Sequence, residues 1–342
     1  MKFVRTKLES SNTTVKHSAY RYIAWGIATG LLAGSVQAAP IVYIPTGSGN
    51  SVAEVDAATD SVIRQYPGVD NPHGLVATPD GEYVITASLK EATEGTEKGK
   101  SNLFMVHPAH GHVMQTVEVE GWSHHQAITP DGRYVLSTHP TRNQVSVLDV
   151  ESSEIAATVK TGAGPYYLVV TKDGSKAYVS NAGAGTVDEI DLSNWSISRT
   201  LEAGPGPKHM TLSKDDKILY VSNSAQGSIS AITLDGTQPR QQQQVGKNLH
   251  GLDISDDGRK LFVTSQKEDK LVALNPDSGE IQKISLSPRP YHLNSVEGTG
   301  KVYVTSRSTP QVWVIDQQSM EVIRTFELPA GEGHQMAIVK EQ

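Results

Sequence analysis

The residues best suited to chemistry in this sequence are its 12 histidines, since the chain of 342 residues has no cysteine. Imidazole is a common ligand of zinc, copper, iron and nickel, whereas the lack of cysteine excludes thiolate ligands and disulfides. Most of these histidines share one place in a repeated pattern, six or seven residues before a turn. The residue pairs at that place are His73-Gly74, His124-His125, Tyr166-Tyr167, Lys208-His209, His250-Gly251, Tyr291-His292 and, by the strand that follows it, His334-Gln335.

The turns that define the pattern lie at positions 80, 131, 173, 215, 257 and 298, so they are spaced by 51, 42, 42, 42 and 41 residues. Five of them contain Asp-Gly or Asp-Asp, as in Pro130-Asp131-Gly132, and the sixth is the degenerate Glu297-Gly298-Thr299-Gly300. An aromatic or aliphatic run follows each turn. A period of this length is typical of a repeat architecture, in which each repeat is one structural unit.

Each repeat contains four short segments with the alternation of apolar and polar residues that is typical of strands. In the third repeat we expect these strands at 168–171, 177–180, 186–191 and 198–201. Four antiparallel strands in about 42 residues make one blade of a propeller. The additional residues of the first interval, 89–101, are polar and charged, which predicts an exposed loop between two strands of that blade.

The two ends of the repeat region each contain part of a blade. Strands expected at 41–44, 51–56 and 61–66 lack an innermost partner, and a strand expected at 335–339 has nothing after it. Joined, they make one complete blade and remove two exposed sheet edges. The predicted fold class is therefore all-β, a seven-bladed β-propeller of four-stranded blades, with the last blade closed by the N- and C-terminal strands.

Three segments carry a specific resemblance to a known repeat family: Tyr178-Val179-Ser180-Asn181, Tyr220-Val221-Ser222-Asn223 and Tyr303-Val304-Thr305-Ser306. With the Asp-Gly turn before them they resemble the YVTN-type β-propeller repeat, and the resemblance covers nearly all of the chain after residue 38. Similar propellers include the haem d1-binding domain of cytochrome cd1-type nitrite reductases and the copper-binding propeller of nitrous-oxide reductase. The resemblance implies the fold and does not decide the function.

In a propeller the histidine-rich pairs would lie where the chain enters the innermost strands, so they would converge at one mouth of the central channel. Consecutive strand residues point to opposite sides, so about half of the ring should face the axis. The favoured axial set has the seven-residue offset and consists of His73, His124, His250 and His334, with Tyr166, Lys208 and Tyr291 completing a cofactor site. The alternative set is His125, His209 and His292. The expected ligand is a transition metal (copper, iron or zinc) or a haem-like cofactor.

Other residues of interest are open to two interpretations. Trp122 could wall a flat cofactor or could pack between blades. His107, His110 and His112 have spacing suited to a metal, but a solvated turn between two outer strands is the favoured interpretation. The repeated histidines themselves could cap loops and have been inherited with the repeat. The sequence contains no nucleophile elbow, phosphate loop, dinucleotide fingerprint or Cys-x-x-Cys-His motif, so it assigns no catalytic residue.

The first 38 residues have the features of a secretory signal. A basic segment precedes the apolar run 22–35, and Val36-Gln37-Ala38 supplies small residues before a cleavage site near Ala39. We therefore expect a signal peptide at 1–38, a propeller at 39–342 and a periplasmic or secreted location. The signal carries five basic residues and one acid, so its removal shifts the net charge from −7 to −11. An acidic chain has no general attraction for nucleic acid or anionic lipid.

Three functions remain compatible with these features. The first is an exported propeller that binds a metal ion or metallocofactor at its histidine-rich mouth, as a carrier or accessory factor. The second is a redox or lyase enzyme that uses the same site. The third is an interaction scaffold for another exported protein, with structural histidines. In each case we expect a monomer with no nucleic-acid partner and no membrane contact after cleavage. The partner is a small ligand or a metal in the first two cases and another exported protein in the third.

Overall fold

β-Strands build the described part of the chain, residues 39–236 and 241–340 of a computed structural model, and they form seven antiparallel sheets of four strands. Six blades follow one another along the chain. Their strands are β4 (Pro72–Ala77), β5 (Val84–Ser88), β6 (Lys100–His107) and β7 (His112–Glu120); β8 (Gln126–Ile128), β9 (Tyr134–His139), β10 (Gln144–Asp149) and β11 (Glu154–Lys160); β12 (Pro165–Val170), β13 (Lys176–Asn181), β14 (Thr186–Asp191) and β15 (Ser196–Glu202); β16 (Pro207–Leu212), β17 (Ile218–Asn223), β18 (Ser228–Thr233) and β19 (Gln241–Gln244); β20 (Leu249–Ile254), β21 (Leu261–Ser265), β22 (Lys270–Leu274) and β23 (Ile281–Ser285); β24 (Pro290–Val296), β25 (Lys301–Ser306), β26 (Gln311–Asp316) and β27 (Val322–Glu327).

The seventh blade combines both ends of the described chain, as predicted. Its strand order is β28 (Ala337–Val339), β1 (Ile41–Thr46), β2 (Ser51–Asp56) and β3 (Ser61–Pro67). β28 pairs with β1 in antiparallel register, with Ile41 opposite Val339 and Tyr43 opposite Ala337. The predicted seven-bladed propeller with terminal closure is confirmed.

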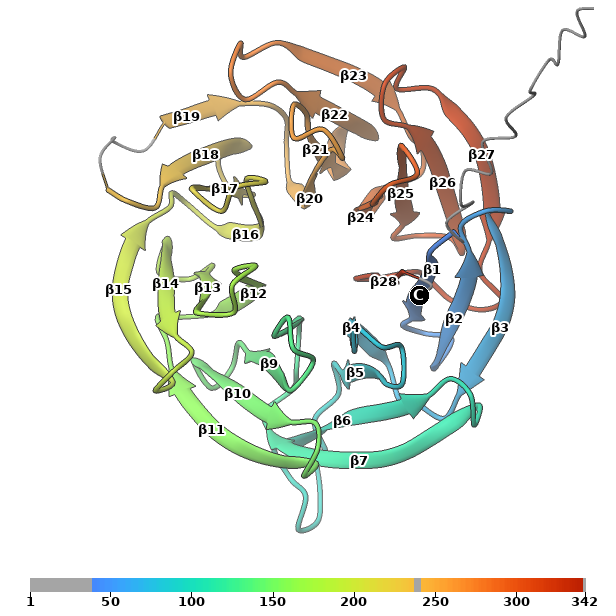
Figure 1. The fold of residues 1–342 in the computed structure, drawn as a ribbon, viewed down its shortest axis with the longest axis vertical. Helices are drawn as coiled ribbons and strands as arrows, with labels where there is room; N and C mark the ends of the chain where they lie inside the picture. Colours follow the sequence, from blue (N-terminus) through green and yellow to red (C-terminus); the bar gives the residue numbers. More distant parts are fainter. Residues whose placement is uncertain (1–38, 237–240, 341–342) are drawn as a thin grey trace, which may run out of the picture. The chain divides into compact units, whose positions relative to one another are not determined.

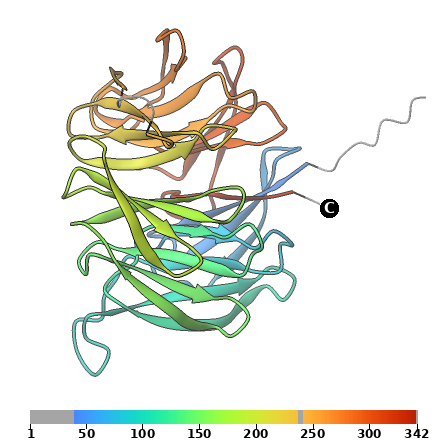
Figure 2. The same ribbon diagram turned by 60° about the vertical axis from the view of Figure 1, so that its left-hand side comes forward.

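The blades are arranged in a ring around a central channel, with β4, β12, β16, β20, β24 and β28 among the strands nearest the axis (Figure 1). An oblique view, turned by 60°, shows the blades as twisted sheets packed beside one another (Figure 2). The second and third strands of each blade are buried on both faces, as in β10, whereas outer strands such as β15 alternate exposed and half-buried residues. The core therefore consists of apolar layers between neighbouring blades.

The loop predicted at 89–101 lies between β5 and β6 and is mostly exposed, although Lys100 and Ser101 already belong to β6. At the other end of the blades, the repeated turns have one design. A Thr or Ser hydroxyl donates to the turn Asp, as from Thr129 Oγ1 to Asp131 Oδ1 at 2.5 Å, and the same oxygen accepts the N–H of Arg133 at 3.0 Å.

The predicted signal peptide, residues 1–38, lies outside the described residues. Within those residues, no helix combines the length and the apolar character that crossing a membrane would require. The described helical structure is the short 3-10 turn η1 (Gln266–Glu268).

Candidate metal centre

The innermost strands begin with an irregularity at the histidine-rich pairs. In five blades the antiparallel register breaks across these two residues, for example between Pro72 and Leu75 and between Pro290 and Leu293. The same break occurs in β12, β16 and β20. A bulge of this kind suspends the alternation of side chains, so both members of a pair can turn toward the channel.

Two blades carry glycine as the second member of the pair because the next blade comes too close for a side chain. A Cβ atom on Gly74 would lie 2.5 Å from the carbonyl oxygen of His124, and one on Gly251 would lie 2.8 Å from that of Tyr291. At these blades the histidine can stand only at the first position, as His73 and His250.

Seven histidines from six blades meet in the channel, and we call them the histidine ring. Its members are His73, His124, His125, His209, His250, His292 and His334. All are buried, with exposed fractions of 0–6%. Neighbouring imidazole centroids are 4.1 Å apart for His124 and His125 and 4.2 Å for His73 and His334. The sequence placed these residues together correctly, but they fill the channel beneath its mouth rather than standing open to solvent.

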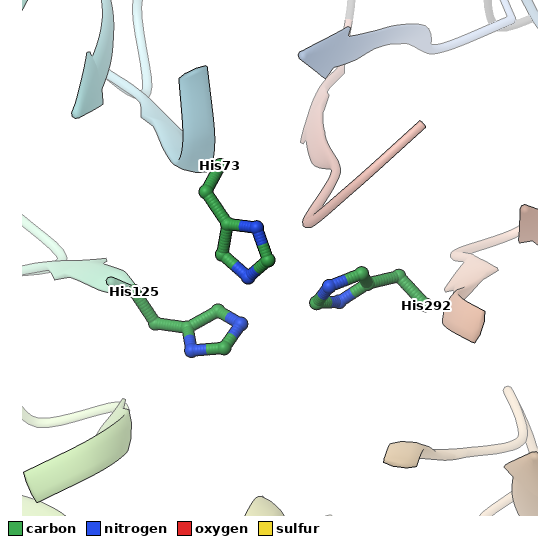
Figure 3. Close-up of side chains that lie close together, drawn as sticks. All are labelled: His73, His125 and His292. Atoms are coloured by element: carbon green, nitrogen blue, oxygen red, sulfur yellow. The ribbon is translucent and has the colours of Figure 1, made fainter. Parts of the chain in front are cut away.

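Two groups of three histidines have ring nitrogens within 4.8 Å of one another: His73, His125 and His292, and His209, His250 and His292. Figure 3 shows the first group, in which three imidazoles from three blades point toward a common point. Both groups combine the two sequence offsets, because the bulges bring both members of a pair to the axis. The expected separation of the ring into an axial and a non-axial set therefore does not describe them.

The other two ring members flank these groups. His124 stacks on His73 with centroids 4.5 Å apart, and its Nδ1 lies 3.3 Å from the carbonyl oxygen of Tyr166. His334 Nε2 lies 3.4 Å from a carboxylate oxygen of Glu332. Both contact His73 and surround the candidate ligands.

Several buried nitrogens of the ring have no protein partner. These are both nitrogens of His73, Nε2 of His125 and of His209, and Nδ1 of His250 and of His334. Leaving a buried polar atom without a partner costs about 1–3 kcal/mol. His125 Nδ1 lies 2.8 Å from the carbonyl oxygen of Tyr166, so that nitrogen carries the proton and Nε2 presents its lone pair to the channel.

The imidazoles of the ring are held in the neutral form, which is the form that binds metals. Burial is the largest cause and lowers the pKa of His73, His125, His209, His250 and His292 well below the ordinary value. It lowers the pKa of His124 to about 3. Burial also lowers the pKa of His334, although the neighbouring Glu332 opposes that shift.

Comparison with known proteins identifies the fold family. The sequence profile of the YNCE-like beta-propeller family matches residues 23–333. The chain belongs to this family. No curated protein sequence matches the chain significantly.

Solved structures of other propellers resemble this YNCE-like propeller over most of its length. The Kuenenia stuttgartiensis hydrazine synthase aligns with a TM-score of 0.72 at 15% identity, covering 86% of this chain and 100% of that one. The periplasmic gluconolactonase PpgL of Pseudomonas aeruginosa aligns with a TM-score of 0.67 at 22% identity, covering 88% and 99%. A protein from Lactobacillus plantarum gives 0.73 at 15% identity, covering 88% and 99%. Likeness at these identities concerns the fold alone.

The predicted cofactor residues of this YNCE-like propeller form a layer at the channel mouth. Tyr166 lies 4.1 Å from the His124 ring, Tyr291 stacks on His250 at 4.1 Å, and Trp122 meets His124 edge-on at 5.4 Å. The Lys208 ammonium lies 5.2 Å from the centre of the Tyr166 ring. This layer covers the ring from the solvent side, because Lys208, Tyr166 and Trp122 are partly exposed while the histidines are buried.

Arg307 also belongs to the mouth and was not predicted from the sequence; its guanidinium lies 4.8 Å from the centre of the Tyr291 ring. It follows β25, at the place where Ala182 and Ser224 follow the equivalent strands. A cation at an aligned position where the other blades carry uncharged residues was the available signal. Asp253 was also missed: it belongs to β20, and its charge contributes to raising the pKa of Tyr167, after the larger effect of burial.

The remaining histidines have other surroundings. His139 is buried within its blade, where Nε2 lies 2.7 Å from Ser146 Oγ and Nδ1 lies 3.3 Å from Ser123 Oγ. His107, His110 and His112 lie at the turn between β6 and β7, as predicted, and His112 is exposed. Among the described residues these three form no group with nitrogens close enough for one metal.

Proposed function

We propose that this protein binds one transition-metal ion in the histidine ring and serves as a metal carrier or accessory factor outside the cytoplasm. The observation that carries the proposal is the distance of 3.3 Å between His250 Nε2 and His292 Nε2, in a buried ring with several unpartnered nitrogens. A tetrahedral ion with metal–nitrogen bonds of about 2.0–2.1 Å holds its ligand nitrogens about 3.3 Å apart. The pair is thus spaced as two ligands of one ion.

His209 supplies the third ligand, because its buried Nε2 lacks a partner and its nitrogens complete a group with His250 and His292. The second group, His73, His125 and His292, is an alternative position for the same ion. Since His292 belongs to both groups, it is the ligand on which binding depends at either position.

The spacing of the ring supports a bare ion rather than a haem-like cofactor. Imidazole centroids 4.1–5.7 Å apart leave no room for a macrocycle between them. Neutral nitrogen ligands without thiolate suit zinc and copper, and also iron or nickel. With neutral ligands, the bound ion keeps its full positive charge.

The test is a calorimetric titration of chelator-treated protein with Zn²⁺, Cu²⁺ and Co²⁺, combined with the visible spectrum of the cobalt form. We expect one ion per chain and a spectrum typical of tetrahedral nitrogen coordination. The variant His292→Ala should bind at least about 100-fold more weakly, since it removes a ligand from both groups. The matched control is His110→Ala, which changes a histidine at the outer turn and should bind like the parent.

Two outcomes would contradict the proposal. If the parent binds none of the three ions, the histidines are structural, and co-purification with another exported protein would then support the scaffold function. If His110→Ala rather than His292→Ala abolishes binding, the metal binds at the outer turn instead of in the channel.

A further inference from the structure

Two cations stand at the channel mouth without a carboxylate partner. The ion pairs found among residues 39–236 and 241–340 use cations other than Lys208 and Arg307. Each instead lies over a tyrosine ring, Lys208 over Tyr166 and Arg307 over Tyr291. An unpaired cation over an aromatic ring is partly stabilised by the ring and remains free to bind an anion.

These two cations stand over neighbouring parts of the same mouth. The tyrosine rings beneath them both lie against His250, with ring centroids 6.1 Å apart for Tyr166 and 4.1 Å apart for Tyr291. Lys208 is partly exposed and Arg307 is exposed, so both charges are accessible to an anion from solvent. The carboxylate of Glu332 already has two other partners: it accepts a hydrogen bond from Ser48 Oγ and lies 3.4 Å from His334 Nε2.

A hollow extends outward from Lys208 over the blades that contain β16 and β20. Its volume is ≈ 680 Å³, and its lining includes Lys208, Lys247 and Lys267 but no carboxylate. The other lining residues are polar or small, among them Gln226 and Asn248. Such a surface suits a polar molecule with hydroxyl groups and offers little to an apolar one.

We propose that the channel mouth binds a small hydroxylated molecule through one oxyanionic group, a carboxylate or a phosphate ester, held between Lys208 and Arg307. The guanidinium offers paired N–H donors to two oxygens of the anion, and the ammonium offers a point charge. The body of the molecule lies in the hollow, where amide and hydroxyl side chains bind its hydroxyl groups.

This site does not depend on a metal ion, so its success or failure is separate from that of the proposed metal centre. The test is calorimetric titration of the full chain, before and after treatment with a chelator, using three compounds with one carbon skeleton: glycerate, glycerol 3-phosphate and glycerol. We expect binding of glycerate, of glycerol 3-phosphate or of both in each state, and none of the neutral glycerol. Whichever anion binds more tightly identifies the anionic group.

The decisive variants are Lys208→Gln and Arg307→Gln. Each should weaken anion binding by about tenfold, and the double variant should abolish it. The matched control is Lys217→Gln, an exposed lysine beside Asp215 at the opposite end of the blade, which should bind like the parent. Equal binding of glycerol, unchanged binding in both mouth variants, or binding that disappears with the metal and ignores Arg307→Gln would each overturn the proposal.

Discussion

The two ends of the innermost strands come from the same repeat, yet they differ in the hydrogen bonding of their polar groups. At the turn end, a Thr or Ser hydroxyl donates to the turn Asp in five blades. These pairs are Thr78–Asp80, Thr129–Asp131, Thr171–Asp173, Ser213–Asp215 and Ser255–Asp257. The same Asp oxygen also accepts a backbone N–H two residues later, so each turn satisfies itself within five residues.

At the histidine end, side chains from different blades meet and six ring nitrogens remain buried without a partner. Residue types also vary there, with His, Tyr and Lys at one aligned position. A repeated residue that is satisfied by its own turn serves the fold. A buried polar residue with no hydrogen-bond partner in the protein points to a ligand, because without a ligand it only destabilises the fold.

The largest effect should come from breaking the closed circle of seven blades, because both ends of the innermost strands depend on it. Deletion of residues 333–342 removes β28, its pairing with β1 and the hydrogen bond from Gln335 Nε2 to Gln126 O. Two sheet edges are then exposed, so we expect loss of the cooperative melt and aggregation. Size-exclusion chromatography and thermal unfolding measure this. A truncated chain that stays monomeric and melts like the parent would refute the closure as the basis of stability.

The second prediction concerns how the free energy of unfolding depends on pH in protein freed of metal. The histidine end should respond to pH and the turn end should not. The folded ring keeps its imidazoles neutral, whereas the unfolded chain takes up protons below pH about 6.5, so acid favours unfolding. Between pH 6.5 and 5.5 each such histidine should lower the free energy of unfolding by about 1 kcal/mol, which gives several kcal/mol for the whole histidine ring. Asp253, whose pKa is raised by burial, acts in the opposite direction but is one group against seven.

The turn end should not respond in that window, since its hydrogen bonds lower the pKa of Asp173 to about 2. Chemical denaturation at several pH values measures both effects. The control Asp173→Asn should leave the slope between pH 6.5 and 5.5 unchanged. A free energy of unfolding that stays flat over this range would mean that the imidazoles are not held neutral.

A third experiment compares two buried histidines. His73 has no partner for either nitrogen, so His73→Leu should stabilise the metal-free protein by about 1–2 kcal/mol. His139 has a serine hydroxyl at each nitrogen, so His139→Leu should destabilise it by about 1–3 kcal/mol. Denaturant titration of both variants measures the two changes in the free energy of unfolding, which should have opposite signs. Destabilisation of equal size in both would show that His73 has partners and belongs with the structural residues.

The sequence predicted the fold because each turn and strand is encoded locally and then repeated. The 42-residue spacing placed His125, His209 and His292 at one level of the ring without any knowledge of contacts. The orientation of the ring members could not be predicted, since the bulge at the start of each innermost strand breaks the alternation on which that inference depended. Arg307 was not predicted because it reaches the mouth from a different element, the turn after β25, rather than from the start of an innermost strand.

The smallest effect tests the turn end itself. Asp131 is exposed and accepts hydrogen bonds from Thr129 Oγ1 and from the N–H of Arg133. Asp131→Ala removes both, but water can replace the lost partner at this exposed place, so the expected loss of stability is only about 0.5–1 kcal/mol. Metal binding and anion binding should not change, because the turn lies at the other end of the strand from the histidine ring. Denaturant titration gives the first quantity and calorimetry the second. A change in metal affinity of tenfold or more would mean that the two ends are coupled through the innermost strand, and the distinction between a self-satisfied turn and a ligand-dependent ring would fail.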